Sequence, residues 1–152
     1  MCFGKFDLLN LLSRRILCAI IAGCFSFTAL ADEVKATDYG AIPGDGKCAA
    51  AAINKAIESC SPGDRLVFEP GTYDLWDTIA VENKKELEII GNGAILLLRG
   101  FDRSDGGPVF SAIRVRSSER ITIRDFVVDM DVSPNTAGEV VYVDDDTFDL
   151  NV

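Results

Sequence analysis

The chain has 152 residues, a formal net charge of −9 at neutral pH, 48% hydrophobic residues and no histidine. Without imidazole, this chain cannot use Ser-His-Asp or Cys-His catalysis or histidine-ligated zinc, so its chemistry must use carboxylates, Arg, Lys or Tyr. The acidic balance, with no basic stripe carrying interleaved aromatics, argues against nucleic acid as a partner.

The first 31 residues have the layout of a secretory signal peptide. A basic start precedes the apolar run "ILCAIIAGCFSFTALA", which closes in small residues just before Asp32. The run is shorter than the ~20 apolar residues that span a bilayer, so we expect cleavage after Ala31 and no membrane span afterwards. The mature chain, 32–152, loses three cations and one anion, which makes its net charge −11. We expect it to be secreted or periplasmic.

Two other export signals are alternatives. "IAGC", ending at Cys24, resembles a bacterial lipoprotein cleavage box, which would leave the protein lipid-anchored through Cys24. The apolar stretch that continues past it argues against this alternative. "SRRILC" resembles a twin-arginine signal but lacks the usual following aromatic residue and Lys.

One amphipathic helix is predicted at 48–60, after a loop broken by Gly and Pro. Its apolar residues recur at three- and four-residue steps: Ala49, Ala52, Ile53, Ala56, Ile57 and Cys60. "SPG" at 61–63 ends the helix, because Pro cannot continue the hydrogen-bond ladder. Cys48 and Cys60 then lie roughly 18 Å apart, so we expect no disulfide between them. They are either buried thiols or partners of cysteines outside this sequence.

From residue 66 onward the chain is predicted to form short strands, each with alternating inward residues. The predicted inward pairs are Leu66/Phe68, Tyr73/Leu75, Ile79/Val81, Leu87/Ile89, Ile95/Leu97, Ile113/Val115, Ile121/Ile123 and Phe126/Val128. The pairs recur about every 22 residues if 99–110 is an insertion, and such a period indicates a solenoid. Each coil must then stack on the next to bury its apolar face. An antiparallel sandwich is the alternative.

Two stretches carry a family resemblance. "DYGAIPGDGKCAAAAINKAIESCSPGDRLVFEPGTYDL", residues 38–75, resembles the N-terminal signature of the pectate-lyase-like superfamily. "AIRVRSSERITIRDFVVDMD", residues 112–131, is similar to a later coil of that fold. The resemblance implies an all-β, right-handed parallel β-helix whose N-terminal end is capped by the helix. It also implies a carbohydrate-active protein with a polysaccharide or oligosaccharide as its partner.

The helix start departs from that family's pattern. Members usually have Thr and paired Asp residues after the Gly-Asp-Gly turn, whereas this chain has Lys47-Cys48-Ala49-Ala50. These residues predict a helix N-terminus without a side-chain cap.

The segment 132–152 has two interpretations. "GEVVYVDDDTFDLNV" either continues the coils or forms a hairpin across an Asp145-Asp146 turn. With "DMDVSPNTAG" before it, the segment resembles the start of a β lobe inserted in some β-helix glycosidases, including the α-1,3-galactosidase family. Because an uncapped coil exposes apolar surface and strand edges, we interpret the chain as the N-terminal portion of a longer protein, incomplete at its C-terminus.

Outward arginines are the candidate substrate-binding residues. Arg114, Arg116 and Arg124 alternate with inward residues, and their guanidinium groups suit a uronate carboxylate. The alternative is a solvated face of ion pairs with Glu119 and Asp125.

Asp129 and Asp131 are candidates either for calcium binding or for a carboxylate pair in glycoside hydrolysis. No cofactor is otherwise expected, and calcium is expected only if the protein is lyase-like. Trp76 either stacks on a sugar or packs at a coil edge.

These observations predict the N-terminal part of a secreted glycoside hydrolase or polysaccharide lyase. The resemblance implies that the catalytic carboxylates come from central coils beyond residue 152, so we expect this chain to be inactive alone. A non-catalytic surface or adhesion β-helix that binds glycan or protein is the alternative function.

Overall fold

The computed structural model describes residues 31–99, 110–130, 138–144 and 146–152, so 1–30 of the expected signal peptide lie outside it. The described chain is all-β apart from one α-helix and one 3-10 helix. The elements are β1 (Glu33–Lys35), the 3-10 helix η1 (Ala36–Tyr39), α2 (Ala50–Ser59), β2 (Arg65–Val67), β3 (Thr72–Leu75), β4 (Ile79–Glu82), β5 (Lys85–Leu98), β6 (Phe110–Arg116), β7 (Glu119–Met130), β8 (Gly138–Val143) and β9 (Phe148–Asn151).

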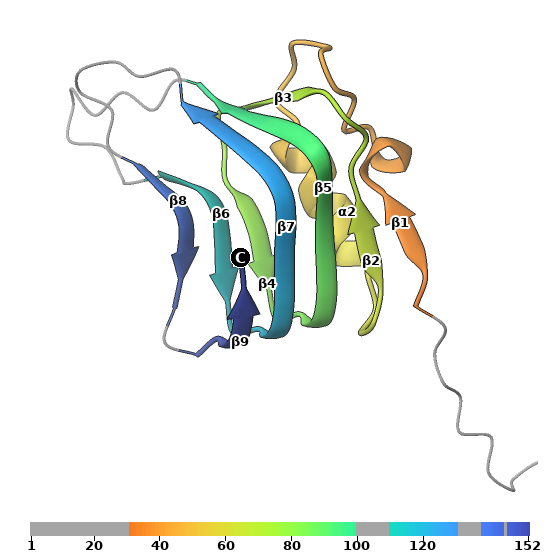
Figure 1. Cartoon of the computed structure of the whole chain (residues 1–152), viewed down its shortest axis with the longest axis vertical. Coiled ribbons are helices and arrows are strands. Elements are labelled where there is room, and N and C mark those ends of the chain that lie inside the picture. The colour runs from red at the N-terminus through yellow and green to blue at the C-terminus, as the bar shows by residue number, and fades with distance from the viewer. Residues whose placement is uncertain (1–30, 100–109, 131–137, 145) are drawn as a thin grey trace, which may run out of the picture.

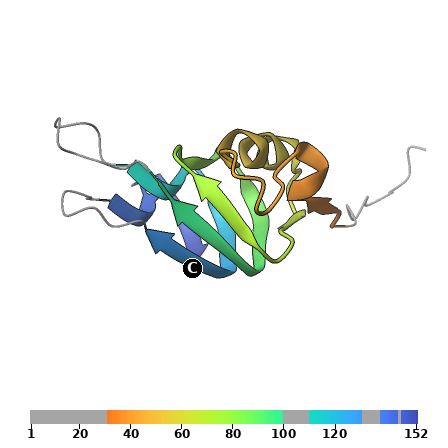
Figure 2. The same ribbon diagram turned by 90° about the horizontal axis from the view of Figure 1, so that it is seen from above.

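The strands form two sheets in which all the pairs are parallel. A six-stranded sheet has the order β1-β2-β5-β7-β9, with β3 also paired to β5, and a three-stranded sheet has the order β4-β6-β8. Figure 1 shows the N-terminal elements at one end of this stack and β8 and β9 at the other, and Figure 2 shows it from above. An antiparallel sandwich is therefore wrong for the described strands.

The inward side chains of successive strands stack in columns. The register places residues of matching character at the same level in each sheet, so aliphatic side chains cover one another from strand to strand. The columns are Val34-Leu66-Ile89-Ile123, Leu87-Ile121-Leu150, Tyr73-Leu96-Val128, Ile79-Ile113-Val141 and Val81-Val115-Val143.

The register corrects two details of the predicted alternation. Leu66 pairs with Ile89, an offset of 23 residues, instead of stacking on Leu87. The inward pair predicted at Ile95 and Leu97 is wrong, because Ala94, Leu96 and Leu98 are the buried residues. Asn92 and Gly93 have left-handed backbone conformations, with φ of 51° and 78°. They rotate the chain at this corner, so the alternation restarts at Ala94.

Left-handed residues also stack from coil to coil. By the strand register, Gly63, Glu86, Arg120 and Asp149 occupy one level, and their φ values are 96°, 53°, 55° and 54°. Non-glycine residues rarely adopt this conformation. Its recurrence at one level indicates that each coil turns the same corner, although the sequence keeps glycine only in the first coil.

The helix α2 lies within the predicted 48–60 and buries its apolar stripe. Ala50, Ile53, Ala56 and Ile57 are buried. As predicted, the N-cap residue Ala49 makes no side-chain cap, and its N–H instead donates to the carbonyl of Asp74 (2.9 Å).

At the other end of α2, Lys84 Nζ donates to the carbonyls of Glu58 (3.0 Å) and Cys60 (2.9 Å). A cation suits the negative end of a helix. Cys48 and Cys60 are both free thiols, as expected from the helix between them.

Asn54 connects α2 to the outer edge of β4. Its side-chain amide donates to the carbonyl of Thr78 (3.2 Å), and its side-chain oxygen accepts from the N–H of Ala80 (2.8 Å). One amide therefore replaces the peptide group of a neighbouring strand at an edge that would otherwise be open to pairing. The predicted role of the helix as a cap has this polar contact as well as its apolar stripe.

The C-terminal strands continue both sheets. β8 pairs in parallel with β6, and β9 pairs in parallel with β7, so the hairpin interpretation of this segment is wrong. Residues 132–137 lie outside the described residues, and the inserted lobe at 132–152 stays a prediction as a domain boundary. Val140, Tyr142, Val143 and Val152 are exposed at this end of the stack.

We predict that Gly91→Ala destabilises the fold by about 2 kcal/mol or more, because overpacking a tight site has costs of that size. A Cβ at position 91 would lie 2.4 Å from the carbonyl oxygen of Asp125 and 2.7 Å from the Phe126 ring. Urea denaturation measures the change. Gly93→Asn is the control, because that position is open and Asn tolerates the left-handed conformation. Equal stability of Gly91→Ala and wild type would contradict this packing.

We predict that Asn54→Ala lowers the free energy of unfolding by about 1–3 kcal/mol, because it leaves Thr78 O and Ala80 N without a partner. The uncovered edge of β4 should also promote self-association, which sedimentation velocity detects. Lys55→Ala, at an exposed position of the same helix, is the control. A monomeric Asn54→Ala variant of unchanged stability would show that the contact has no such role.

Candidate functional site

The structure divides the three predicted binding arginines between the two sheets. Arg114 and Arg116 lie on β6 in the three-stranded sheet, whereas Arg124 lies on β7 in the six-stranded sheet. All three are in ion pairs: Arg114 with Glu82 (2.9 Å), Arg116 with Asp144 (3.3 Å), and Arg124 with Glu88 (2.8 Å) and Asp125. A sugar carboxylate would have to displace these partners, and their binding role stays a prediction.

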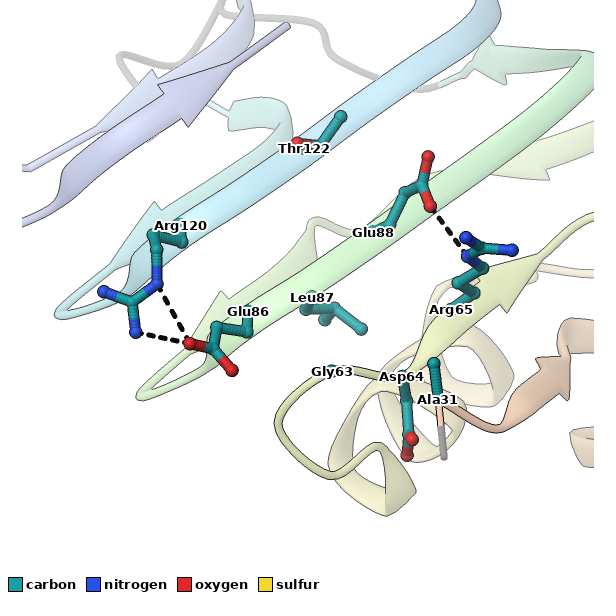
Figure 3. A pocket seen from close by; sticks show the side chains of 9 residues that line it. All are labelled: Ala31, Gly63, Asp64, Arg65, Glu86, Leu87, Glu88, Arg120 and Thr122. Atoms are coloured by element: carbon teal, nitrogen blue, oxygen red, sulfur yellow. Dashed lines mark hydrogen bonds and ion pairs between the residues drawn. The ribbon is translucent and has the colours of Figure 1, made fainter. Parts of the chain in front are cut away.

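The six-stranded sheet carries a charged groove of about 330 Å³ on its outer face. Residues from β2, β5 and β7 line it, and Figure 3 shows two ion pairs across it. Arg65 Nε lies 3.0 Å from Glu88, and Arg120 lies 2.7 Å from Glu86. Glu88 also accepts from Arg124, so one carboxylate bridges arginines from the strands on either side.

Asp64 lies at the N-terminal end of this groove and is only 8% exposed. Its two oxygens accept backbone N–H groups, Oδ2 from Ser61 (2.7 Å) and Oδ1 from Asp32 (3.1 Å). In the described part of the chain, no Lys or Arg side chain pairs with Asp64. A buried carboxylate without a cationic partner is unusual.

Ion pairing displaces the pKa of two carboxyl groups downward. The pKa of Glu119 is lowered chiefly by a hydrogen bond from Lys85, with Arg120 adding to it. At Asp144, desolvation raises the pKa, but the Thr147 hydroxyl, the Ser117 N–H and Arg116 together lower it more. Both groups are therefore held as carboxylates, which suits ion pairing and not proton donation.

The calcium candidates are not brought together in the described structure. Asp129 is exposed on β7, and Asp131 lies outside the described residues. Among the residues that are described, no group of three or more Cys, Asp and Glu side chains could hold a metal ion. The calcium hypothesis thus rests on the sequence alone.

Trp76 lies between β3 and β4 and is 49% exposed. Arg99 follows the end of β5, donates its N–H to the carbonyl of Leu75, and pairs with Asp74. An exposed indole beside polar side chains can contact one face of a sugar ring. Of the two interpretations of Trp76, complete burial in the core is excluded.

The remaining groups favour structural roles. Burial raises the pKa of the Cys60 thiol, which makes it a poor nucleophile. Burial also raises the pKa of Tyr73, whose hydroxyl donates to the carbonyl of Glu69 (3.0 Å). No helix within the described ranges is long and apolar enough to cross a membrane.

Several of these residues could not be identified from the sequence. Asp64 follows "SPG", which signalled only a turn, and Asn54 was placed simply off the apolar stripe of the helix. Glu86 and Glu88 carry no motif, because their partners Arg120 and Arg124 are 34 and 36 residues away. The one available signal was the coil period, which aligns such positions once the register is known.

The chain is similar to two α-1,3-galactosidases. It is 34% identical to α-1,3-galactosidase A of Shewanella woodyi over 142 residues, covering 78% of this chain and 22% of that protein. It is 28% identical to α-1,3-galactosidase B of Bacteroides thetaiotaomicron over 141 residues, with the same coverage of each chain. The chain thus spans about a fifth of the length of both relatives. No family model matches it.

We predict that the carboxylate of Asp144 stabilises the turn after β8 and that this contribution is lost in acid. Its pKa is lowered in the folded protein, so the stabilisation is complete above the unfolded pKa of about 3.9 and declines as the pH falls below it. Urea midpoints at pH 6 and pH 3 should therefore differ less in Asp144→Asn than in wild type. Asp146→Asn, at an exposed position of the same turn, is the control. An unchanged pH dependence in Asp144→Asn would contradict the assignment.

Proposed function

We propose that this chain is the N-terminal part of an exported carbohydrate-active enzyme built on a right-handed parallel β-helix. The enzyme is a glycoside hydrolase that acts on galactosides, and its catalytic carboxylates lie on coils beyond residue 152. The observation that carries the proposal is the similarity to two α-1,3-galactosidases over 78% of the chain.

The fold supports this proposal because its two parallel sheets repeat in register. Successive coils superimpose at offsets of 23 residues between β2 and β5, and 34 between β4 and β6. A chain that passes through the same two sheets in every coil is the geometry of a β-helix. The right-handed sense is part of the proposal, because parallel crossovers are right-handed in about 98% of cases.

The described residues support a structural role for this part and not a catalytic one. A glycosidase needs two carboxyl groups, one of them protonated as the acid. Here Glu86 and Glu88 are both engaged by arginines, and Asp144 and Glu119 are held as carboxylates. The chain alone is therefore proposed to lack activity.

A non-catalytic glycan-binding β-helix is the second candidate, and the exposed Trp76 favours it. Trp76 is the single tryptophan of the chain, so its fluorescence reports directly on any ligand that contacts it. A binding module should show a saturable change in this fluorescence with a galactoside. The enzyme proposal does not require that change in the chain alone.

A chimera tests the enzyme proposal. Residues 32–152 replace the matched segment of the Shewanella woodyi galactosidase, and galactose release from an α-1,3-galactoside is measured. We predict kcat/KM within about tenfold of the parent, because a site misplaced by about 1 Å loses on the order of 100-fold. The parent enzyme without the segment is the control and should be inactive.

The outcomes of the chimera experiment separate the two candidates. A folded but inactive chimera would contradict the enzyme proposal, and a fluorescence response to galactoside in the same protein would then favour the binding module. Arg124→Gln in an active chimera tests the predicted sugar contact, which should raise KM and leave kcat unchanged. Hydrolysis by the 152-residue chain alone would contradict the proposed division of roles.

A further inference from the structure

The buried carboxylate of Asp64 lies beside the backbone nitrogen that signal cleavage would release. The accepted donor is the N–H of Asp32, 3.1 Å from Asp64 Oδ1, and Asp32 is the residue that follows the expected cleavage position. We propose that cleavage between Ala31 and Asp32 creates an α-ammonium group that forms a buried ion pair with Asp64 and fixes the first strand. The inference rests on the proposed export of the chain.

The geometry holds Asp32 in place from two sides. The carbonyl of Asp32 accepts the N–H of Arg65 (2.9 Å), while its nitrogen donates to Asp64. Ala31 lies at the edge of the groove, next to Asp64, as Figure 3 shows. The nitrogen released by cleavage would thus already lie within ion-pair distance of the carboxylate.

The surrounding charges leave Asp64 as the available partner. Arg65 is paired with Glu88, and Arg120 is paired with Glu86, across the same groove. Asp64 makes hydrogen bonds to two N–H groups, but no Lys or Arg of the described residues neutralises it. An α-ammonium supplies the missing positive charge, and a buried ion pair that keeps its additional hydrogen bonds has a favourable geometry.

The cleavage step is a hydrolysis by a signal peptidase, an endopeptidase of the export machinery. Water adds across the peptide bond, so hydroxyl goes to the carbonyl carbon of Ala31 and hydrogen to the nitrogen of Asp32. The resulting amine is protonated at neutral pH, because the ordinary pKa of an α-amino group is about 7.7–8.0. Before cleavage, the same nitrogen is a neutral amide, so the ion pair exists only in the mature protein.

The first experiment determines the N-terminus. The full chain is expressed with export in a bacterial host, and the product is examined by intact mass and N-terminal sequencing. We expect a chain that begins at Asp32. A start at any other residue, including a lipidated Cys24, would overturn the proposal. This result is independent of whether the chimera is active, so it separates the inference from the proposed function.

The second experiment tests the ion pair in the mature product. Half of the sample is acetylated at its α-amine in urea at pH 6.5, where lysines react slowly, and both halves are refolded. We expect acetylation to lower the urea midpoint in wild type and to have no effect in Asp64→Asn. Asp45→Asn is the matched control, because Asp45 is an exposed carboxylate that also accepts a backbone N–H, from Lys47.

The pH dependence decides the case if Asp64→Asn does not fold. The groups that face the α-ammonium are Asp64 and Arg65 from the β2 end, Glu86 and Glu88 from β5, and Arg120 from β7. A pairing carboxylate raises the pKa of the amine in the folded state, so the stabilisation is complete below the unfolded pKa and is lost as pH rises through the folded pKa. The free and acetylated proteins should differ at pH 6.5 and converge near pH 10. A difference that does not change with pH, or no difference, would overturn the ion pair.

Discussion

The parallel backbone ladder between β5 and β7 is the interaction on which the rest of the structure depends. It aligns residues from Lys85 to Leu98 with residues from Glu119 to Met130. Because the two strands keep one register over both of their straight parts, inward side chains stack on side chains of the same kind. The same ladder aligns Glu88 with its arginine partners on the outer face, so core and groove follow from one constraint.

The two ends of the stack are treated differently by the sequence. At the N-terminal end, α2 covers the core with small and β-branched side chains, and Asn54 satisfies the edge of β4. At the other end, β8 and β9 expose apolar side chains such as Tyr142 and Val152. A parallel stack needs such protection because every unpaired strand edge offers hydrogen-bonding groups to another strand. The proposed continuation of the coils beyond residue 152 would give β8 and β9 the same protection.

The sequence predicted the features that depend on local pattern and missed those that depend on register. The apolar stripe of α2, its uncapped start and most inward pairs could be predicted, because each follows from a few neighbouring residues. The inward face failed after Asn92, where left-handed backbone reverses the alternation without any loss of strand-forming residues. Asp64 and Asn54 were not identified because their partners lie 32 and 24 or more residues away and carry no motif. The predicted arginines were correctly placed facing outward, but periodicity could not show that Arg124 lies on another sheet than Arg114.

The parallel register is the central claim, and nuclear Overhauser effects between backbone protons test it most directly. The register places Ile89 opposite Ile123, and Leu87 opposite both Ile121 and its neighbours in the parallel sense. Contacts between the Hα and amide protons should therefore advance in the same direction along both strands. Contacts that advance in opposite directions, or contacts linking β8 to β9 as a hairpin, would contradict the account.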